Sequence, residues 1–454
     1  MADEVEKTAT RTTCGFFMAR KNRFCKMIVG KGKRYCGEHS HLGGEDKACG
    51  RTRIPCPLDP KHTVFEDQLQ KHLKRCNVKK KTDVIYFEKN INSGLTDYKP
   101  TEGETTPLPD VSLQTVKELI NRVKYIHQDN CPEIKESILS HSIFNDELSK
   151  SEYGTSALKH LKQQASLIGH LQKLDLLKSD TVYLEFGAGK GKLSHWIQQA
   201  IPNASNTEFV LIDRASNRHK FDSSHKRNDQ GPDFKRLNLD IEHLNLGKVP
   251  LVGKSSKDIT AVSKHLCGTA TDLTLRCLFE TLSDKVCNDN INSSKDSSDH
   301  DQSHSKRLKS SPDIKGIAIA LCCHHQCYWP HYVGRPFLEG LGFTAVDFHL
   351  ICCISSWATC GIRPPKSNPD VKENNEESQA KTENITGHVQ SLGLSIAERE
   401  DIGRQCKRLL DLGRLWYLRT KGMSAKLCYY VDRSVSLENV VLLATEDRLR
   451  EEDR

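Results

Sequence analysis

Eight cysteine and histidine residues near the start of the chain have the types and spacings of metal ligands. One set is Cys14, Cys25, Cys36 and His39, and a second set is Cys56, His62, His72 and Cys76. Thiolate and imidazole side chains bind zinc tetrahedrally, and four protein ligands make a closed structural site. The sequence therefore predicts two structural zinc ions, with His41 and Cys49 as substitute ligands; the alternative is a scatter of reduced cysteines.

The residues around the second set have a pattern of their own. Thr63 and Glu66 have the spacing of a capping box, which predicts a helix that starts at this point. On such a helix His72 and Cys76 lie four residues apart and on the same side. The predicted cap and the ligand spacing agree on one metal site, against the alternative of coincidental residues.

A glycine-rich stretch, Glu185 to Gly191, is the second place where the sequence could do chemistry. Residues 181–184 before it predict a buried strand, and residues 193–200 after it predict a helix. Glycines in such a turn let the backbone approach a ligand closely. A P-loop is excluded because Phe186 holds the position of its first glycine, and a dinucleotide site is disfavoured because the third glycine comes one residue early.

The acidic-x-Gly-x-Gly-x-Gly pattern of this stretch resembles motif I of S-adenosylmethionine (SAM) methyltransferases. The resemblance implies that Gly187, Gly189 and Gly191 lie against the methionine half of SAM. It also implies that Glu185 helps to bind the ammonium end. The alternative is an ordinary glycine turn without a ligand.

Polar side chains follow the other predicted strands where each strand ends. Residues 208–213 and 236–240 predict strands ending in Asp213 and Asp240, and strands at 258–263 and 314–321 are followed by Lys264 and Cys322. Open α/β sheets bind ligands at the carboxyl ends of their strands. Asp213 stands where a ribose diol needs an acceptor with two oxygens, although either acid could instead cap a helix.

Composition divides the 454 residues into several parts. Residues 1–48 predict a CCCH-type zinc finger, residues 49–81 a CHHC-type zinc finger, and residues 82–150 a linker with a helix at 113–127. Residues 151–450 predict one α/β domain that ends in a pair of strands at 427–431 and 440–444. Polar segments near 283–313 and 364–387 predict disordered inserts in this domain.

Charge and cysteine content limit the partners and the compartment. The net charge is +8, but residues 14–81 alone, with 17 Lys and Arg against 6 Asp and Glu, carry +11. Such a block favours a polyanion, most often nucleic acid, over a merely solvated basic surface. Eighteen cysteines without a signal peptide predict metal ligation rather than disulfides and a reducing compartment: the nucleus, the cytoplasm or both. No apolar run is long enough to span a membrane.

Nearly the whole chain resembles the eukaryotic tRNA 2′-O-methyltransferases that modify nucleotide 4 of the acceptor stem. The residues that carry the resemblance are the two Cys/His sets, 184–192, Lys-His-Leu-Cys-Gly-Thr-Ala-Thr-Asp-Leu at 264–273, Leu-Cys-Cys-His-His at 321–325 and Ser-Leu-Glu-Asn-Val at 436–440. The resemblance implies a Rossmann-like class I methyltransferase sheet, SAM as cofactor, and tRNA as substrate.

A ribose 2′-hydroxyl is a poor acid, so a base or cation beside it would help methyl transfer. The candidates are Lys264, His265, His324 and His325, and the sequence does not choose among them. The segment 322–327 could also bind a third metal or simply pack. Rival functions are a zinc-finger RNA-binding protein with a non-catalytic methyltransferase-like fold, a nicotinamide-dependent oxidoreductase, and a methyltransferase for protein or DNA.

Overall fold

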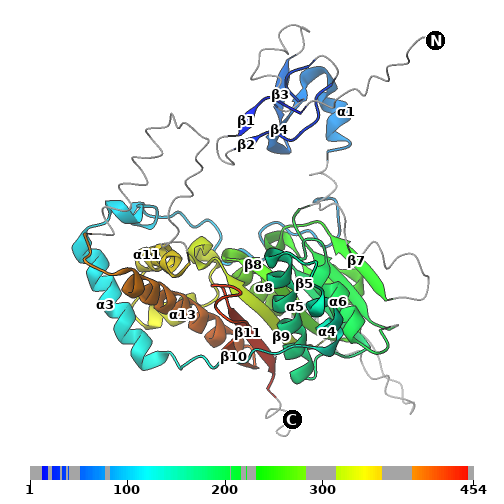
Figure 1. The fold of residues 1–454 in the computed structure, drawn as a ribbon. Helices are drawn as coiled ribbons and strands as arrows, with labels where there is room; N and C mark the ends of the chain where they lie inside the picture. The colour runs from blue at the N-terminus through cyan, green and yellow to red at the C-terminus, as the bar shows by residue number, and fades with distance from the viewer. Residues whose placement is uncertain are drawn as a thin grey trace, which may run out of the picture. The chain divides into compact units, whose positions relative to one another are not determined.

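A computed structural model describes most of the chain as two compact units, Met1–Val84 and Ile85–Arg454 (Figure 1). The described residues are 13–18, 23–30, 33–36, 39, 52–76, 82–204, 206–215, 221, 232–282, 313–359 and 391–447. The predicted inserts near 283–313 and 364–387 lie outside these residues, except for Asp313. None of the described helices is long and apolar enough to cross a membrane.

A seven-stranded sheet forms the centre of the second unit, with strand order β10-β11-β9-β8-β5-β6-β7. Its strands are β5 (Thr181–Phe186), β6 (Glu208–Ile212), β7 (Asp233–Leu237), β8 (Asp258–Cys267), β9 (Ile314–Cys322), β10 (Met423–Tyr429) and β11 (Val440–Glu446). Five neighbouring strands, β9, β8, β5, β6 and β7, are parallel to one another. β11 pairs antiparallel with both β9 and β10. The predicted Rossmann-like methyltransferase fold with its closing hairpin is confirmed.

Several strand boundaries differ from the sequence prediction, including that of β10, which begins at Met423 rather than at 427. The third strand is Asp233–Leu237 rather than 236–240, and its exposed residues alternate with partly buried ones because it is the edge strand. Because an edge strand carries charged side chains, it lacks the continuous apolar run by which buried strands are recognised in a sequence. The fourth strand continues through Cys267, beyond the predicted end at 263, after a register shift between Ser263 and Leu266.

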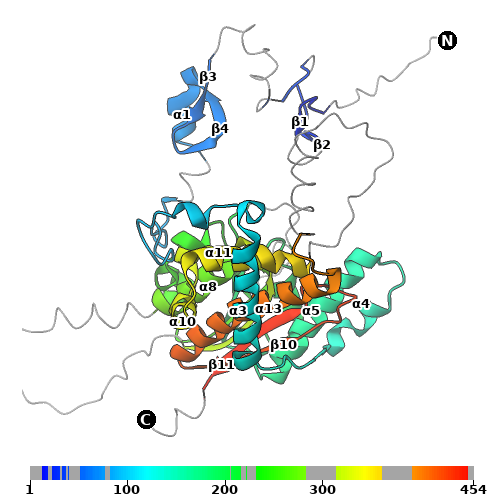
Figure 2. The same cartoon turned by 90° about the vertical axis from the view of Figure 1, so that its left-hand side faces the viewer.

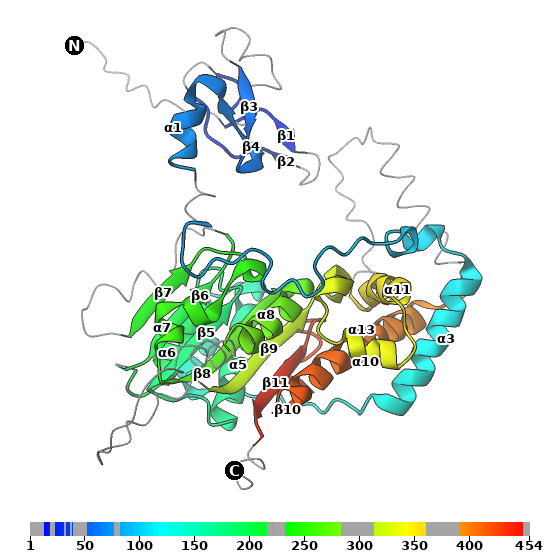
Figure 3. The same cartoon turned by 180° about the vertical axis from the view of Figure 1, so that it is seen from behind.

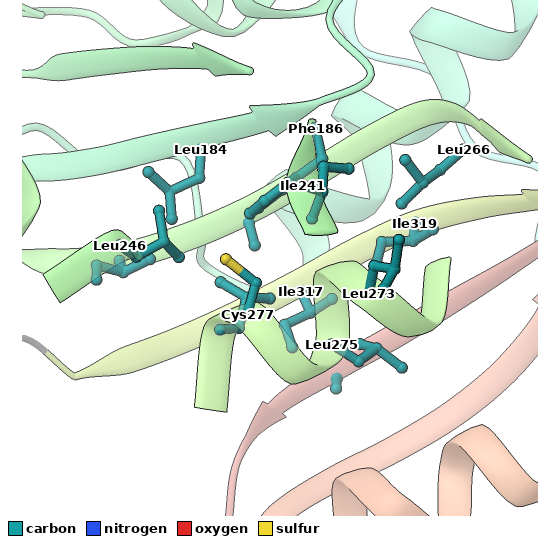
Figure 4. Packing of buried hydrophobic residues seen from close by; sticks show 14 of the residues in the cluster. Leu184, Phe186, Ile241, Leu246, Leu266, Leu273, Leu275, Cys277, Ile317 and Ile319 are labelled. Atoms are coloured by element: carbon teal, nitrogen blue, oxygen red, sulfur yellow. The ribbon is translucent and has the colours of Figure 1, made fainter. Parts of the chain in front are cut away.

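Helices cover both faces of the sheet. On one face α5 (Thr155–Lys173) and α6 (Lys192–Ala200) contact β5, β8 and β9. On the other face lie α8 (Thr269–Glu280) and α13 (Ile396–Thr420), as Figure 3 shows from behind. Figure 4 shows Leu273 and Cys277 of α8 against Ile317 and Ile319 of β9. Burial on both faces explains why β5 has no exposed residue.

A third hydrophobic cluster lies beyond the sheet, where α3 (Leu113–Asn130), α10 (Arg335–Gly340) and α11 (Ala345–Ser355) pack with α13 (Figure 2). The predicted linker before α3 is irregular, and it packs against the second unit. The Asn92 side chain is fully buried and donates to the carbonyl oxygens of Ile241 and Leu244 at 2.6 and 2.8 Å. The segment is irregular because single hydrogen-bonding side chains, rather than a periodic apolar face, hold it to this unit.

The first unit contains two small hairpins. They are β1 (Phe17–Met18) with β2 (Arg23–Phe24), and β3 (Arg53–Cys56) with β4 (Asp59–Phe65). The 3-10 turn η3 (Glu66–Gln68) and the short helix α1 (Leu69–Leu73) follow β4. The predicted capping box is wrong: Thr63 lies within β4, where its hydroxyl accepts from Arg53 Nε at 3.1 Å, and no side chain caps η3.

Candidate functional site

The first predicted ligand set converges in the structure. Cys14, Cys25 and Cys36 are buried, and their sulfur atoms lie with His39 Nδ1 within 4.8 Å of one another. Cys25 Sγ is 4.0 Å from Cys36 Sγ, and Cys36 Sγ is 3.3 Å from His39 Nδ1. Tetrahedral zinc with Zn–S bonds of about 2.3 Å requires neighbouring sulfurs about 3.8 Å apart. The spacing therefore fits one zinc ion.

The second set converges as well, through β3, β4 and α1. Cys56 Sγ lies 4.0 Å from Cys76 Sγ and 3.2 Å from His72 Nε2, and His62 Nε2 lies 3.1 Å from His72 Nε2. The hairpin supplies Cys56 and His62, while α1 supplies His72 and the chain just after it supplies Cys76. The four ligand atoms again fit a closed tetrahedral site.

The glycine-rich stretch forms the turn between β5 and α6. Gly187, Gly189 and Gly191 have φ angles of 64°, 52° and 77°, a left-handed conformation that strongly favours glycine. A Cβ atom at Gly187 would meet the His265 carbonyl oxygen at 3.1 Å, so the turn lies against the end of β8. A Cβ atom at Gly189 would meet no atom of the described residues within 4 Å. The turn therefore has a packed side and an open side.

Glu185 lies at the end of β5 and is 4% exposed. Its Oε2 atom accepts from the backbone amide and the hydroxyl of Ser194, at 3.0 and 2.5 Å. Ser194 belongs to the first turn of α6, where the helix has unpaired amide donors and a partial positive charge. Glu185 thus ties the strand to the helix on either side of the glycine turn.

Asp213 and Asp240 follow β6 and β7 at the same edge of the sheet. Asp213 Oδ2 accepts from the Gly189 amide at 2.7 Å, and Oδ1 accepts from the Ala215 amide at 2.7 Å. Asp240 caps the 3-10 turn η9 (Ile241–His243) by accepting from the Glu242 amide at 3.3 Å. The structure thus brings Asp213 to the glycine turn, whereas Asp240 has the capping role that the sequence left as an alternative.

The ends of β8 and β9 bring a third group of metal-type side chains together. Cys267 and Cys322 are partners in the parallel pair, with their sulfur atoms 3.4 Å apart. Cys322 Sγ is also 3.3 Å from Nδ1 of the exposed His265. The neighbouring Lys264 turns toward α5, where Nζ lies 3.0 Å from His160 Nδ1. Burial, followed by the charge of Lys192, lowers the pKa of Lys264.

The two remaining catalytic candidates separate in the structure. His325 is exposed in the 3-10 turn η11 (His324–Gln326), whereas His324 in the same turn is 1% exposed. His324 Nε2 lies 2.6 Å from Oδ1 of the fully buried Asp411. Burial lowers the pKa of His324, so the neutral ring donates to this carboxylate. His324 is thus buried against Asp411, where it holds the turn that follows Cys322.

A buried ionic cluster continues from Asp411 and was missed by sequence reasoning. Arg414 of α13 donates through Nε and Nη2 to both carboxylate oxygens of Asp272 on α8, at 3.1 and 2.8 Å. Its Nη1 donates to Asp411 Oδ1 at 3.2 Å, and all three side chains are fully buried. Burial by itself would raise the pKa of Asp411, but His324, Arg408 and Arg414 hold that pKa at about 2.

Glu438 in the β10–β11 connection was also missed as a site residue. Its Oε2 accepts from Lys407 Nζ at 2.7 Å, and its Oε1 accepts from the Cys323 amide at 3.4 Å. Cys323 has a φ angle of 46°, a conformation that is uncommon for a residue with a side chain. Two sequence signals could have indicated these residues. Arg414 is a charged residue on the apolar face of α13, and Glu438 is an acid within the stretch 436–440 that carries the family resemblance.

The titration of His324 gives a test of its assigned role. Because its pKa is lowered in the folded chain, its stabilising contribution is complete above about pH 6.5 and falls as the pH drops below that value. His324→Gln keeps a donor for Asp411 but does not titrate. We expect the variant to lose less unfolding free energy than the wild type between pH 7 and pH 5.

Urea unfolding followed by tryptophan fluorescence measures this difference, because all four tryptophans lie in the second unit. The exposed His325, replaced by glutamine, serves as the matched control and should retain the wild-type pH dependence. Equal pH dependence in His324→Gln and the wild type would contradict the assignment.

Comparison with known proteins gives three family matches. A family model described as Methyltransferase TRM13 matches residues 162–445. A model described as a CCCH zinc finger in TRM13 protein matches residues 12–40, and a model described as a U11-48K-like CHHC zinc finger matches residues 53–77. Both finger matches contain the complete ligand sets described above.

Full-length relatives agree with these matches. Proteins of mouse and human, each named tRNA:m(4)X modification enzyme TRM13 homolog, are 40% identical over 95% of this chain and 94% of their own length. The Saccharomyces cerevisiae protein named tRNA:m(4)X modification enzyme TRM13 is 31% identical over 96% of both chains. The likeness therefore includes the fingers as well as the sheet.

Proposed function

Since this chain belongs to the TRM13 methyltransferase family, we propose that it transfers a methyl group from SAM to the ribose 2′-hydroxyl of nucleotide 4 in the tRNA acceptor stem. The relatives' names supply the tRNA and the position. The observation that carries the proposal is the turn of three glycines with left-handed φ angles at the carboxyl edge of the sheet. At this edge β5 is followed by α6, and the neighbouring β8 is followed by α8.

The residues at this turn fit SAM. The described residues leave the space above Gly189 open, so a ligand can lie directly on the backbone. Asp213 is partly exposed beside it, and carboxylate oxygens that accept one amide each still have lone pairs for a ribose diol. Glu185 holds the start of α6 beneath the turn. We assign Asp213 to the ribose and the turn itself to the methionine half.

SAM supplies a methyl group on a positively charged sulfur, which needs in-line attack by an oriented oxygen. The protein must therefore position the ribose and accept or disperse its proton. His265 is exposed at the end of β8 beside the glycine turn, and Lys264 adjoins it with its amine toward α5. We assign substrate contact to this end of β8, and positioning to His324 through Asp411.

The basic fingers are assigned to tRNA. Residues 14–81 carry a charge of +11, and A-form RNA is read largely through phosphates and 2′-hydroxyls. Deleting residues 1–81 should weaken tRNA binding and reduce the slope of log affinity against log salt by about 0.9 for each phosphate that is no longer neutralised. The SAM affinity should stay unchanged because the second unit has its own core. Filter binding across a salt series and calorimetry measure the two affinities.

A point variant distinguishes the contribution of the folded second finger to tRNA binding from the contribution of its overall positive charge. His72→Ala removes one of four ligands and should release one zinc ion per chain while weakening tRNA binding. Lys71→Ala, its exposed neighbour, should retain the zinc and serves as the control. An unchanged tRNA affinity and salt slope after deletion of residues 1–81 would assign tRNA recognition to the second unit instead.

The proposed reaction is tested by mapping the product. Purified protein, SAM and total tRNA are incubated, and the methylated nucleotide is located by nuclease digestion and mass spectrometry. We expect a 2′-O-methyl group at nucleotide 4 and nowhere else. A methyl group on a base, or at another position, would contradict the proposal.

A further inference from the structure

We propose that His265, Cys267 and Cys322 bind a third zinc ion, which keeps one coordination position open at the carboxyl edge of the sheet. The ligand atoms of these three side chains all lie within 4.8 Å of one another. The group belongs to neither zinc finger, because all three residues come from the second unit. Two thiolates and one imidazole with a free fourth position form a known catalytic zinc arrangement.

The two zinc fingers of the same chain provide a calibration for these distances. In each finger two cysteine sulfurs lie 4.0 Å apart, and sulfur–nitrogen distances between ligands range from 3.2 to 3.8 Å. At the third group the sulfur–sulfur distance is 3.4 Å and the sulfur–nitrogen distance is 3.3 Å. The sulfur–nitrogen distance therefore falls within the range of the two zinc sites, and the sulfur–sulfur distance is shorter than theirs, so the three ligand atoms are close enough to share one ion.

The fold places these ligands by strand register. Cys267 and Cys322 are paired residues of β8 and β9, so both thiols extend from the same place on the sheet edge. The register shift between Ser263 and Leu266 breaks the regular alternation of β8 just where His265 lies. His265 lies in this irregular step, two residues before Cys267, and its Nδ1 reaches Cys322 Sγ at 3.3 Å. The His324–Asp411 bond and the Glu438–Cys323 contact then hold the chain that follows Cys322.

Burial differs among the three ligands in a way that suits an open site. Cys322 is 5% exposed and Cys267 is partly buried, whereas His265 is exposed. An ion held by these residues has protein on the thiolate side and solvent on the histidine side. Cys323 is within hydrogen-bonding reach of Cys267, but it is not among the side chains whose ligand atoms all lie within 4.8 Å of one another. We therefore assign the fourth position to an exogenous oxygen.

The place of the site suggests which oxygen this is, a step that rests on the proposed function. A Cβ atom at Gly187 would lie 3.1 Å from the His265 carbonyl, so the site adjoins the glycine turn. Zinc lowers the pKa of an oxygen that it binds. A bound ribose hydroxyl would lose its proton to solvent and attack the methyl carbon. The new O–C bond would form as the S–C bond breaks, and the sulfur would keep the electron pair as a neutral thioether.

Zinc content of the full-length protein tests the site without relying on activity. After dialysis against a weak chelator, elemental analysis should give three zinc ions per wild-type chain. His265→Ala should give two, and it should fold normally because the side chain is exposed. His265→Cys offers a replacement ligand and should give three. Cys323→Ser is the matched thiol control and should also give three.

Several outcomes would overturn the proposal. Two zinc ions in the wild type, or three in His265→Ala, would leave no third site. Loss of zinc in Cys323→Ser would mean a closed four-ligand site without an open position. Mass spectrometry that finds a Cys267–Cys322 disulfide in protein purified under reducing conditions would assign the pair to redox chemistry instead.

Measurements of methyl transfer distinguish a failure of the zinc proposal from a failure of the proposed function. His265→Ala should lose methyl transfer by at least about 100-fold, equivalent to about 2.7 kcal/mol, while keeping wild-type SAM affinity. If wild-type protein with three zinc ions fails to methylate tRNA, the proposed function is wrong and the metal site stands. If His265→Ala lacks one zinc ion but methylates at the wild-type rate, the catalytic role of the metal is overturned.

Discussion

Gly189→Arg should abolish methyl transfer while leaving tRNA affinity close to that of the wild type. The glycine has a φ angle of 52°, and a Cβ atom there would extend into open space rather than into the protein. An arginine side chain would therefore occupy the volume that we assign to the methionine half of SAM. We expect SAM affinity to fall by at least about 100-fold, equivalent to about 2.8 kcal/mol of binding free energy.

The chain offers a matched control for backbone strain. Gly393 has a φ angle of 71°, and none of the described residues lies within 4 Å of its Cβ position, but it lies just before α13 rather than at the glycine turn. Gly393→Arg should therefore cost similar strain and keep SAM affinity. Calorimetric titration of both variants makes the comparison. Equal SAM affinity in Gly189→Arg and the wild type would show that SAM does not lie on this turn.

Arg414→Met should lower the unfolding free energy of the second unit by about 3–5 kcal/mol, the usual cost of breaking a buried ion pair from one side. The substitution leaves the carboxylates of Asp272 and Asp411 buried without their shared guanidinium. Both acids are fully buried, so water cannot replace the lost partner without opening the core. Urea unfolding followed by tryptophan fluorescence measures the change.

A surface ion pair provides the contrast. Arg433, with a side chain 53% exposed, pairs with Glu400, and Arg433→Met should cost about 0–1 kcal/mol. Combining Arg414→Met with Asp272→Asn should recover part of the loss, because one unpaired charge is removed. If Arg414→Met costs less than about 1 kcal/mol, the cluster does not stabilise this unit.

The sequence predicted those features that depend on local pattern. Buried strands such as β5 have continuous apolar residues, the glycine turn has a fixed spacing, and both zinc ligand sets have short intervals. The sequence-based predictions failed where contacts between residues far apart in the chain determine the local structure. Thr63 joins a strand because Arg53 and β3 lie opposite it, and no local cap competes with that pairing.

The parts of the site that the sequence did not reveal come from distant residues. Arg414 reaches an acid on α8, and Glu438 reaches an amide in the turn after β9. The sequence of a helix with mixed composition does not indicate which distant residue a charged side chain will contact. Likewise, the proximity of Cys267 and Cys322 depends on the register of two strands whose connection contains an insert. Spacing along the chain contains no information about that register.

The strand order β10-β11-β9 has a consequence for how the protein is made on the ribosome. β11 lies between β9 and β10, so among the described strands β10 gains its partner only when β11 has been synthesised. Until then β9 is an open edge, and the turn after Cys322 lacks Glu438. A nascent or prematurely terminated chain that stops before Val440 would expose that edge to aggregation and to proteases. Synthesis as far as the end of β11 is therefore required before the carboxyl edge of the sheet takes its final form.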